Sequence, residues 1–188
     1  MKTYRIIKLL PIITCLLICT ISFGQDKYID KNGTIVFEAS EKLFEEVKAT
    51  NKYATAIYNI ETNEIAALAL MKGFRFKNSL MEEHFNENYI ESDTYPKAIF
   101  KGKIVDFNAT KNLGETAVEV DVKGVLELHG KQKTIETVLT LQKVDNIISM
   151  TGSFVVSPSD FDIEIPKIVR NKIAKMVHVN LDFKLIRK

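Results

Sequence analysis

Histidine is the first residue type to examine for chemistry, because it can act as acid, base or metal ligand near neutral pH. The chain has three histidines, His84, His129 and His178. No two of them stand at the spacing of an HxH or HExxH metal motif. His129 precedes a glycine turn and His178 lies on the polar face of a strand, so both are predicted to be solvated. Only His84 adjoins an unusual segment, which is aromatic and rich in asparagine.

Other catalytic patterns are also missing from the sequence. It contains no GxSxG, no phosphate-binding loop and no GxGxxG. The acidic alternation over residues 159–165 lacks the glycine and the distal glutamate of an EF-hand loop. Because no nucleophile stands in a recognisable arrangement with a base, we predict that the protein is not an enzyme and has no metal site and no cofactor.

The two cysteines, Cys15 and Cys19, lie in an N-terminal segment that predicts export. A basic start, an apolar run over residues 9–21 and small residues before Gln25 form the pattern of a secretory signal peptide. The run is shorter than the roughly 20 apolar residues of a membrane anchor. We therefore predict a signal peptide at residues 1–24 and a periplasmic protein, with secretion as the alternative.

The remainder, residues 25–188, is predicted to be a single domain. Its 164 residues contain 23 Lys and Arg against 24 Asp and Glu, so the net charge of the mature chain is −1. This balance offers no excess of positive charge for nucleic-acid binding. The sequence leaves open whether the protein is a monomer or a homodimer.

Alternation of apolar and polar residues is the main pattern of this domain, and it indicates β-strands. The expected strands cover residues 34–38, 52–59, 65–71, 73–76, 98–107, 116–129, 134–142, 148–156 and 177–186. About eight antiparallel strands must protect their edges, and closure into a barrel does so. We therefore expect an all-β fold with a single antiparallel barrel of about eight strands; the alternative is a two-sheet sandwich.

Two short helices and one irregularity are expected between these strands. Ser79 could cap a helix that runs to Phe85, and a second helix is predicted over residues 166–176, where Pro166 suits the first turn. Gly124 interrupts a long strand and is predicted to mark a bulge or a sharp bend.

Strand 65–71 differs from the others because both of its faces are apolar. Such a strand should be covered on both sides, with a helix outside the barrel. Inside, the small residues Ala67 and Ala69 leave room either for neighbouring side chains or for an apolar ligand.

Four motifs, in order along the chain, resemble those of the YceI-like family. They are Y28-I-D30 with I35-V-F37, H84-F-N-E-N-Y89 with Y95-P-K-A-I-F-K-G102, G124-V-L-E-L-H-G130, and F154-V-V-S-P-S-D-F-D-I163. The resemblance implies an exported, lipocalin-like barrel. Some members of the family hold a polyisoprenoid or an isoprenoid quinone in an elongated apolar pocket. The sequence departs from the family at Asp162, where glycine is usual.

The resemblance therefore implies a lipid-binding protein with an isoprenoid-type chain in its lumen. The in-phase apolar residues expected to contact that chain are Phe37, Leu68, Leu70, Phe74, Phe76, Phe100, Val120, Leu139, Phe154 and Leu181. The residues expected to form a lid or mouth are His84, Phe85, Tyr89 and Tyr95. The alternative is an exported interaction or stress-related protein whose barrel is filled and binds no ligand.

Overall fold

The computed structural model describes residues 26–41 and 45–188, so the predicted signal peptide lies outside the described residues. Nine strands make up most of this part of the chain. They are β1 (Lys27–Ser40), β2 (Lys48–Asn59), β3 (Glu64–Leu70), β4 (Arg75–Phe76), β5 (Lys97–Ile104), β6 (Val118–Leu128), β7 (Lys131–Val144), β8 (Ile147–Val156) and β9 (Ile173–Arg187).

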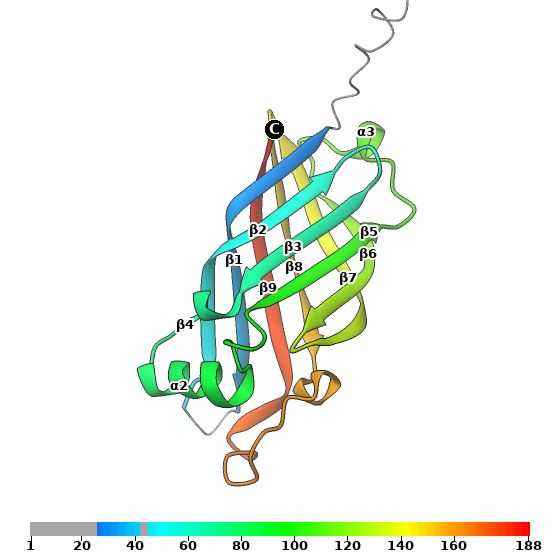
Figure 1. The fold of residues 1–188 in the computed structure, drawn as a ribbon. Coiled ribbons are helices and arrows are strands. Elements are labelled where there is room, and N and C mark those ends of the chain that lie inside the picture. The colour runs from blue at the N-terminus through cyan, green and yellow to red at the C-terminus, as the bar shows by residue number, and fades with distance from the viewer. Residues whose placement is uncertain (1–25, 42–44) are drawn as a thin grey trace, which may run out of the picture.

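Eight of the strands close into an antiparallel barrel (Figure 1). The sheet order is β1-β9-β8-β7-β6-β5-β3-β2, and β1 pairs with β2 as well as with β9. The ninth strand, β4, adds a short ladder to β2. The predicted all-β barrel is thus confirmed, and the sandwich alternative is excluded because two open sheets would not share a continuous ring of pairings.

The predicted first helix is present as α2 (Ser79–His84), although Asn78 caps it rather than Ser79. The Asn78 side-chain oxygen accepts hydrogen bonds from the backbone N–H groups of Leu80 and Met81. The chain then continues as a π-helical turn, η2 (Phe85–Tyr89). The other short helical elements are η1 (Met71–Gly73), α3 (Ala109–Asn112) and η3 (Pro158–Phe161).

The predicted helix over residues 166–176 is wrong. Residues 166–172 form turns, and β9 begins at Ile173, which pairs with Ser40 of β1. The apolar side of the expected helix would have needed a surface to pack against, but Ile168 is 84% exposed. Pairing with β1 thus outweighs a helical periodicity that nothing else supports.

The predicted bulge at Gly124 is wrong, because the ladders on both sides of this residue are unbroken. Gly124 pairs with Gly102 on β5, and the ring of Phe100 occupies the space that two side chains would otherwise fill. A Cβ atom on Gly124 would lie 2.5 Å from Cζ of Phe100. The glycine therefore makes room for an aromatic ring within a regular strand.

The two ends of the barrel differ. We call the end with the β2–β3 and β7–β8 turns and α3 the closed end, and the end with α2, η2, η3 and residues 166–172 the open end (Figure 1). Large side chains fill the lumen toward the closed end, each at most 2% exposed: Tyr28, Tyr58, Ile104, Leu141, Ile148 and Leu185. Desolvation there raises the pKa of Tyr58, whose hydroxyl lies 3.1 Å from Oδ1 of Asn63.

No helix among residues 26–41 and 45–188 combines the length and the apolar character that a bilayer crossing requires.

Candidate ligand-binding cavity

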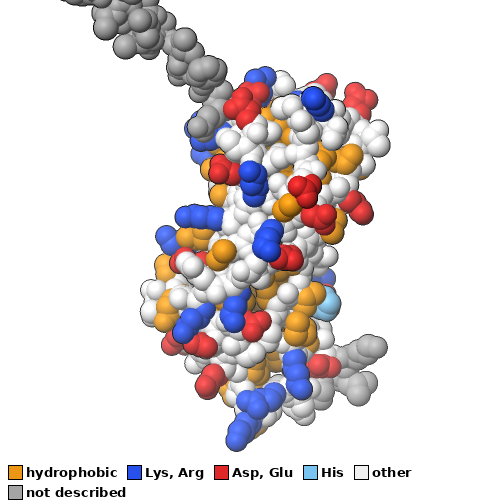
Figure 2. Space-filling view, turned by 90° about the vertical axis from the view of Figure 1, so that its right-hand side faces the viewer, with side chains coloured by type: hydrophobic (Ala, Val, Ile, Leu, Met, Phe, Trp, Pro, Cys, Tyr) orange, Lys and Arg blue, Asp and Glu red, His pale blue; other side chains and the backbone are white. Residues whose placement is uncertain are grey.

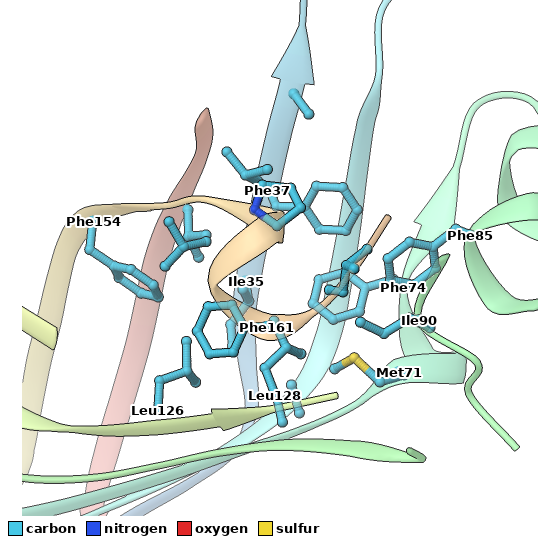
Figure 3. A pocket seen from close by; sticks show the side chains of 18 of the residues that line it. Ile35, Phe37, Met71, Phe74, Phe85, Ile90, Leu126, Leu128, Phe154 and Phe161 are labelled. Atoms are coloured by element: carbon cyan, nitrogen blue, oxygen red, sulfur yellow. The ribbon is translucent and has the colours of Figure 1, made fainter. Parts of the chain in front are cut away.

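A cavity of about 480 Å³ occupies the lumen toward the open end (Figure 3). Its walls come from β1, β3, β4 and all five strands from β5 to β9, together with η1, α2, η2 and η3. This volume falls within the range of roughly 300–1,000 Å³ that is usual for small-molecule sites. The open half of the barrel is therefore hollow, whereas the closed half is packed.

Small residues create much of this space. Ala67 and Ala69 on β3 face Ala98 and Phe100 on β5, so the wall between them carries little side-chain volume. Gly152 on β8 has a different effect: a Cβ there would lie 2.4 Å from Cδ2 of its partner Leu139, so the leucine side chain fills the space that the glycine leaves. The hollow thus results from the size of the inward residues and not from a break in the sheet.

Four phenylalanines form one side of the mouth. The rings of Phe37, Phe74, Phe76 and Phe85 lie within 5.2–6.1 Å of one another in five pairs, mostly tilted or edge-on. Such arrangements are the favourable ones for aromatic pairs. Because Phe85 begins η2, this cluster fastens the helical segment to the barrel wall.

A second apolar cluster forms the opposite side of the mouth. Phe161 of η3 is 1% exposed and packs with Leu126 and Val156, with Phe154 and Ile163 around them. In Figure 3, Leu126 and Phe154 lie across the cavity from Phe74 and Phe85. A ligand would enter between these two walls.

Polar side chains lie mainly at the rim. Glu45, His84 and Lys172 border the cavity and are exposed, and Tyr89 is half-buried there, with a pKa that desolvation raises. Thr137 also borders the cavity, but its hydroxyl donates a hydrogen bond to the carbonyl oxygen of Ser153 at 2.7 Å. The hydroxyl hydrogen is therefore already used and is not available to a ligand. The described residues contain no group of three or more side chains able to hold a metal ion. The deep wall therefore suits an uncharged, apolar chain.

Most of the predicted ligand-contacting residues do line this cavity. They are Phe37, Leu68, Phe74, Phe76, Phe100, Leu139, Phe154 and Leu181. Two are placed elsewhere. Leu70 is 55% exposed outside the barrel, so the outer face of β3 is not fully covered as expected. Val120 points inward but is buried in the packed half, because strand periodicity determines the face of a residue and not its depth along the barrel.

Three of the predicted mouth residues, His84, Phe85 and Tyr89, border the cavity. The fourth, Tyr95, instead packs on the β6–β7 hairpin, where its ring stands edge-on to His129 with centroids 4.4 Å apart. A Cβ on Gly130 would approach the Tyr95 ring to 2.8 Å, so glycine is needed at this contact.

The prediction that His129 is solvated is wrong, because its side chain is only 10% exposed. Its Nδ1 lies 2.8 Å from the carbonyl oxygen of Phe161, and its Nε2 lies 3.0 Å from Oε2 of Glu91. Both ring nitrogens thus have a partner within hydrogen-bond distance. We call this arrangement the His129 latch; it joins the β6–β7 hairpin to η3 and to the segment after η2.

Asp162 ends η3 in the left-handed conformation, with φ 54° and ψ 29°. Glycine adopts this conformation most readily, and Asp is among the residues that tolerate it. The Asp162 carboxylate lies 2.7 Å from Nζ of Lys131. A hydrogen bond and Coulombic attraction from Lys131 lower the pKa of Asp162 and raise that of the lysine. Asp162, which stands where the family usually has glycine, thus keeps the left-handed turn and adds a contact with Lys131 of β7.

Residues 28–185 match the family model of the YceI-like domain. This chain belongs to the YceI-like family. No curated protein matches its sequence. Among solved structures, the YceI-like barrel is similar to a polyisoprenoid binding domain from Saccharophagus degradans implicated in plant cell wall breakdown, with a TM-score of 0.76 and 18% identity over 88% of this chain and 100% of that one.

Two further solved structures share the YceI-like fold at lower similarity. BcnA of Burkholderia cenocepacia gives a TM-score of 0.61 at 14% identity, covering 82% of this chain and 96% of that one. A YceI protein of Campylobacter jejuni gives a TM-score of 0.61 at 14% identity, covering 79% of this chain and 88% of that one. At such identities these comparisons establish the fold.

Proposed function

We propose that this YceI-like protein is an exported, non-catalytic lipid-binding protein that holds an isoprenoid-type chain in the open half of its barrel. The observation that carries the proposal is the cavity of about 480 Å³, whose deep walls are apolar and whose charged groups lie at the rim. Burial of apolar area contributes roughly 25 cal/mol per Å² and needs no charged partner. A long hydrocarbon chain satisfies this site better than a polar metabolite would.

The two apolar walls of the mouth support a ligand that is long and narrow. Its tail would lie beside Ala67, Ala69 and Phe100, and its polar end would reach the rim near His84 and Lys172. The S. degradans domain, which has the same fold, is described as polyisoprenoid binding. An isoprenoid quinone or a polyisoprenoid is accordingly the ligand class that we propose here.

Export rests on the sequence pattern of residues 1–24. Periplasmic location is the proposal, with secretion as the alternative. Mass spectrometry of the protein from cell fractions would find a chain beginning at Gln25 in the periplasmic fraction. Recovery of the protein with residues 1–24 attached, in the cytoplasm, would contradict export.

The alternative function, an interaction or stress-related protein with a filled barrel, is less well supported. A filled lumen would leave a void well below the roughly 300 Å³ of the smallest usual ligand sites. The open half exceeds that value.

The test is extraction of the purified protein followed by mass spectrometry, together with uptake of an isoprenoid quinone. We expect a co-purifying isoprenoid or saturable uptake. Ala69→Trp places a large ring in the lumen, whereas Leu70→Trp, one residue along the same strand, places it on the exposed outer face. Uptake should fall in the first variant and persist in the second.

Unfolding by urea separates loss of binding from loss of structure in the same two variants. If Ala69→Trp lowers uptake only as far as it lowers stability, the lumen is a plain core. If the wild-type protein neither carries nor takes up lipid, the proposed function is wrong.

A further inference from the structure

The last part of the connection between η3 and β9, together with the first four residues of β9, carries a concentrated positive charge at the open end. Residues 166–176, which we call the basic tip, contain four basic residues and no acidic one. The four are Lys167, Arg170, Lys172 and Lys175, and all are exposed. Within the described part of the chain none of them takes part in an ion pair. Their charge is therefore available to a partner in solution.

Apolar residues accompany these charges on the outside of the basic tip. Ile168 is 84% exposed and Met176 is 48% exposed. Val169 and Ile173 of the same segment border the cavity. The tip thus joins exposed cations, an exposed aliphatic side chain and the entrance of the lumen. Cationic residues beside exposed apolar ones are typical of segments that lie in a lipid–water interface.

The position of the basic tip suits contact with a flat surface. In Figure 1 this segment is the lowest part of the molecule and projects past α2, which carries Glu82 and Glu83. Figure 2 shows Lys and Arg side chains at the same extremity, beside hydrophobic ones. The acidic residues of α2 would therefore be held back from a surface that the tip touches.

We propose that the basic tip docks the open end of the barrel on an anionic phospholipid surface. Lys167, Arg170 and Lys175 would contact head-group phosphates, and Ile168 would enter the interface between head groups and acyl chains. An acidic protein would match the cations but gives no reason for an exposed isoleucine beside an apolar entrance. This docking goes beyond the proposed function, because it requires no isoprenoid in the lumen.

The test is co-sedimentation of the purified protein with phosphatidylcholine vesicles, with and without phosphatidylglycerol. We expect binding only when the anionic lipid is present. Raising the ionic strength from 0.1 M to 1 M shortens the Debye length from about 10 Å to about 3 Å, so binding should weaken strongly. Equal binding to both kinds of vesicle, or binding to neither, would overturn the proposal; the second result would leave an acidic protein as the partner of the tip.

Charge-reversal variants locate the docking surface. Each basic residue near an anionic surface is worth roughly fivefold in affinity, so Lys167→Glu combined with Lys175→Glu should weaken binding by more than about tenfold. Ile168→Ser should weaken it by roughly tenfold. The matched control reverses Lys103 and Lys111, which are exposed toward the closed end, and should bind nearly as the wild type does.

If reversing Lys103 and Lys111 weakened vesicle binding to a similar extent, net charge alone would govern binding. That result would overturn the assignment of the docking surface to the basic tip. Uptake of an isoprenoid quinone from detergent solution should be unchanged in the Lys167→Glu, Lys175→Glu variant. If the wild type binds anionic vesicles but takes up no quinone, the proposed function fails while docking stands. If it takes up quinone but binds no vesicles, docking fails alone.

Discussion

The closed and open halves of this barrel are built from the same strands but are filled differently. In the closed half, inward positions carry Tyr58, Ile104, Leu141 and Leu185, and the lumen is packed. In the open half, the inward positions include Ala67, Ala69 and Ala98, and a cavity remains. The volume of the residues at inward positions thus decides which part of a continuous barrel is core and which part can receive a ligand.

The means of closing the two ends also differ. Buried apolar side chains complete the closed end, and a tyrosine with a raised pKa is held among them. At the open end, helical segments lie across the mouth and are fastened by rings, by the His129 latch and by the contact between Lys131 and Asp162. Close packing of side chains thus completes the closed end, whereas a few specific contacts hold the helical segments in place at the open end.

The largest expected difference between the halves concerns removal of an aromatic ring. Tyr28→Ala should lower the free energy of unfolding by about 3–5 kcal/mol, because the ring is 2% exposed in packed surroundings and does not border the cavity. Phe154→Ala should cost clearly less, since its ring already borders open space. Urea denaturation measures both values. Equal losses would mean that the open half is as tightly packed as the closed half.

A smaller effect is expected from breaking the His129 latch. His129→Phe can retain the contact with Tyr95 but leaves the carbonyl of Phe161 and the carboxylate of Glu91 without this partner. Hydrogen bonds of this kind are worth about 1–3 kcal/mol. Hydrogen exchange should increase in η3 and in the segment after η2 and stay unchanged at the closed end.

His178→Phe is the matched control for this experiment, because His178 is exposed on β9. It should change neither exchange nor stability appreciably. If exchange rises equally in both halves of the His129→Phe variant, the latch supports the whole barrel and not the open end.

The smallest expected effect concerns pH and the ion pair of Asp162. Lys131 holds the pKa of this carboxyl below its ordinary value of 3.8, so its contribution is present above that value and disappears as the pH falls through the lower, folded-state pKa. Asp162→Asn keeps a residue that tolerates the left-handed turn but removes the charge. Its slight loss of stability near neutral pH should vanish in strong acid. A loss that persists there would have another cause than this pair.

Local alternation was sufficient to predict the strands and much of the lumen, whereas the preference for a barrel over a sandwich came mostly from the resemblance to the YceI-like family. In β9 the inward positions 177, 179, 181, 183 and 185 follow directly from period two. The same rule placed Phe37, Phe100 and Leu139 correctly at the cavity. It failed for Leu70 and for the helix over residues 166–176, where an apolar pattern had no surface to cover.

The cavity walls contributed by η3 were missed for a different reason. Phe161 lies in a loop sequence without periodicity, and only its packing against Leu126 and Val156 reveals it as a wall. The inward glycine of β6, Gly124, is no signal of the cavity, because the ring of Phe100 fills the space beside it.

The order of residues along the chain is enough to specify strands, their inward faces and membership of the YceI-like family, because side chains alternate at every residue of a strand. It does not specify which stretch of the lumen is hollow or which groups hold the mouth. His129 meets partners 32 and 38 residues away, and the cavity depends on residues from eight strands. Such features arise only when closure of the barrel brings distant side chains together, so they depend on the three-dimensional packing of the whole domain.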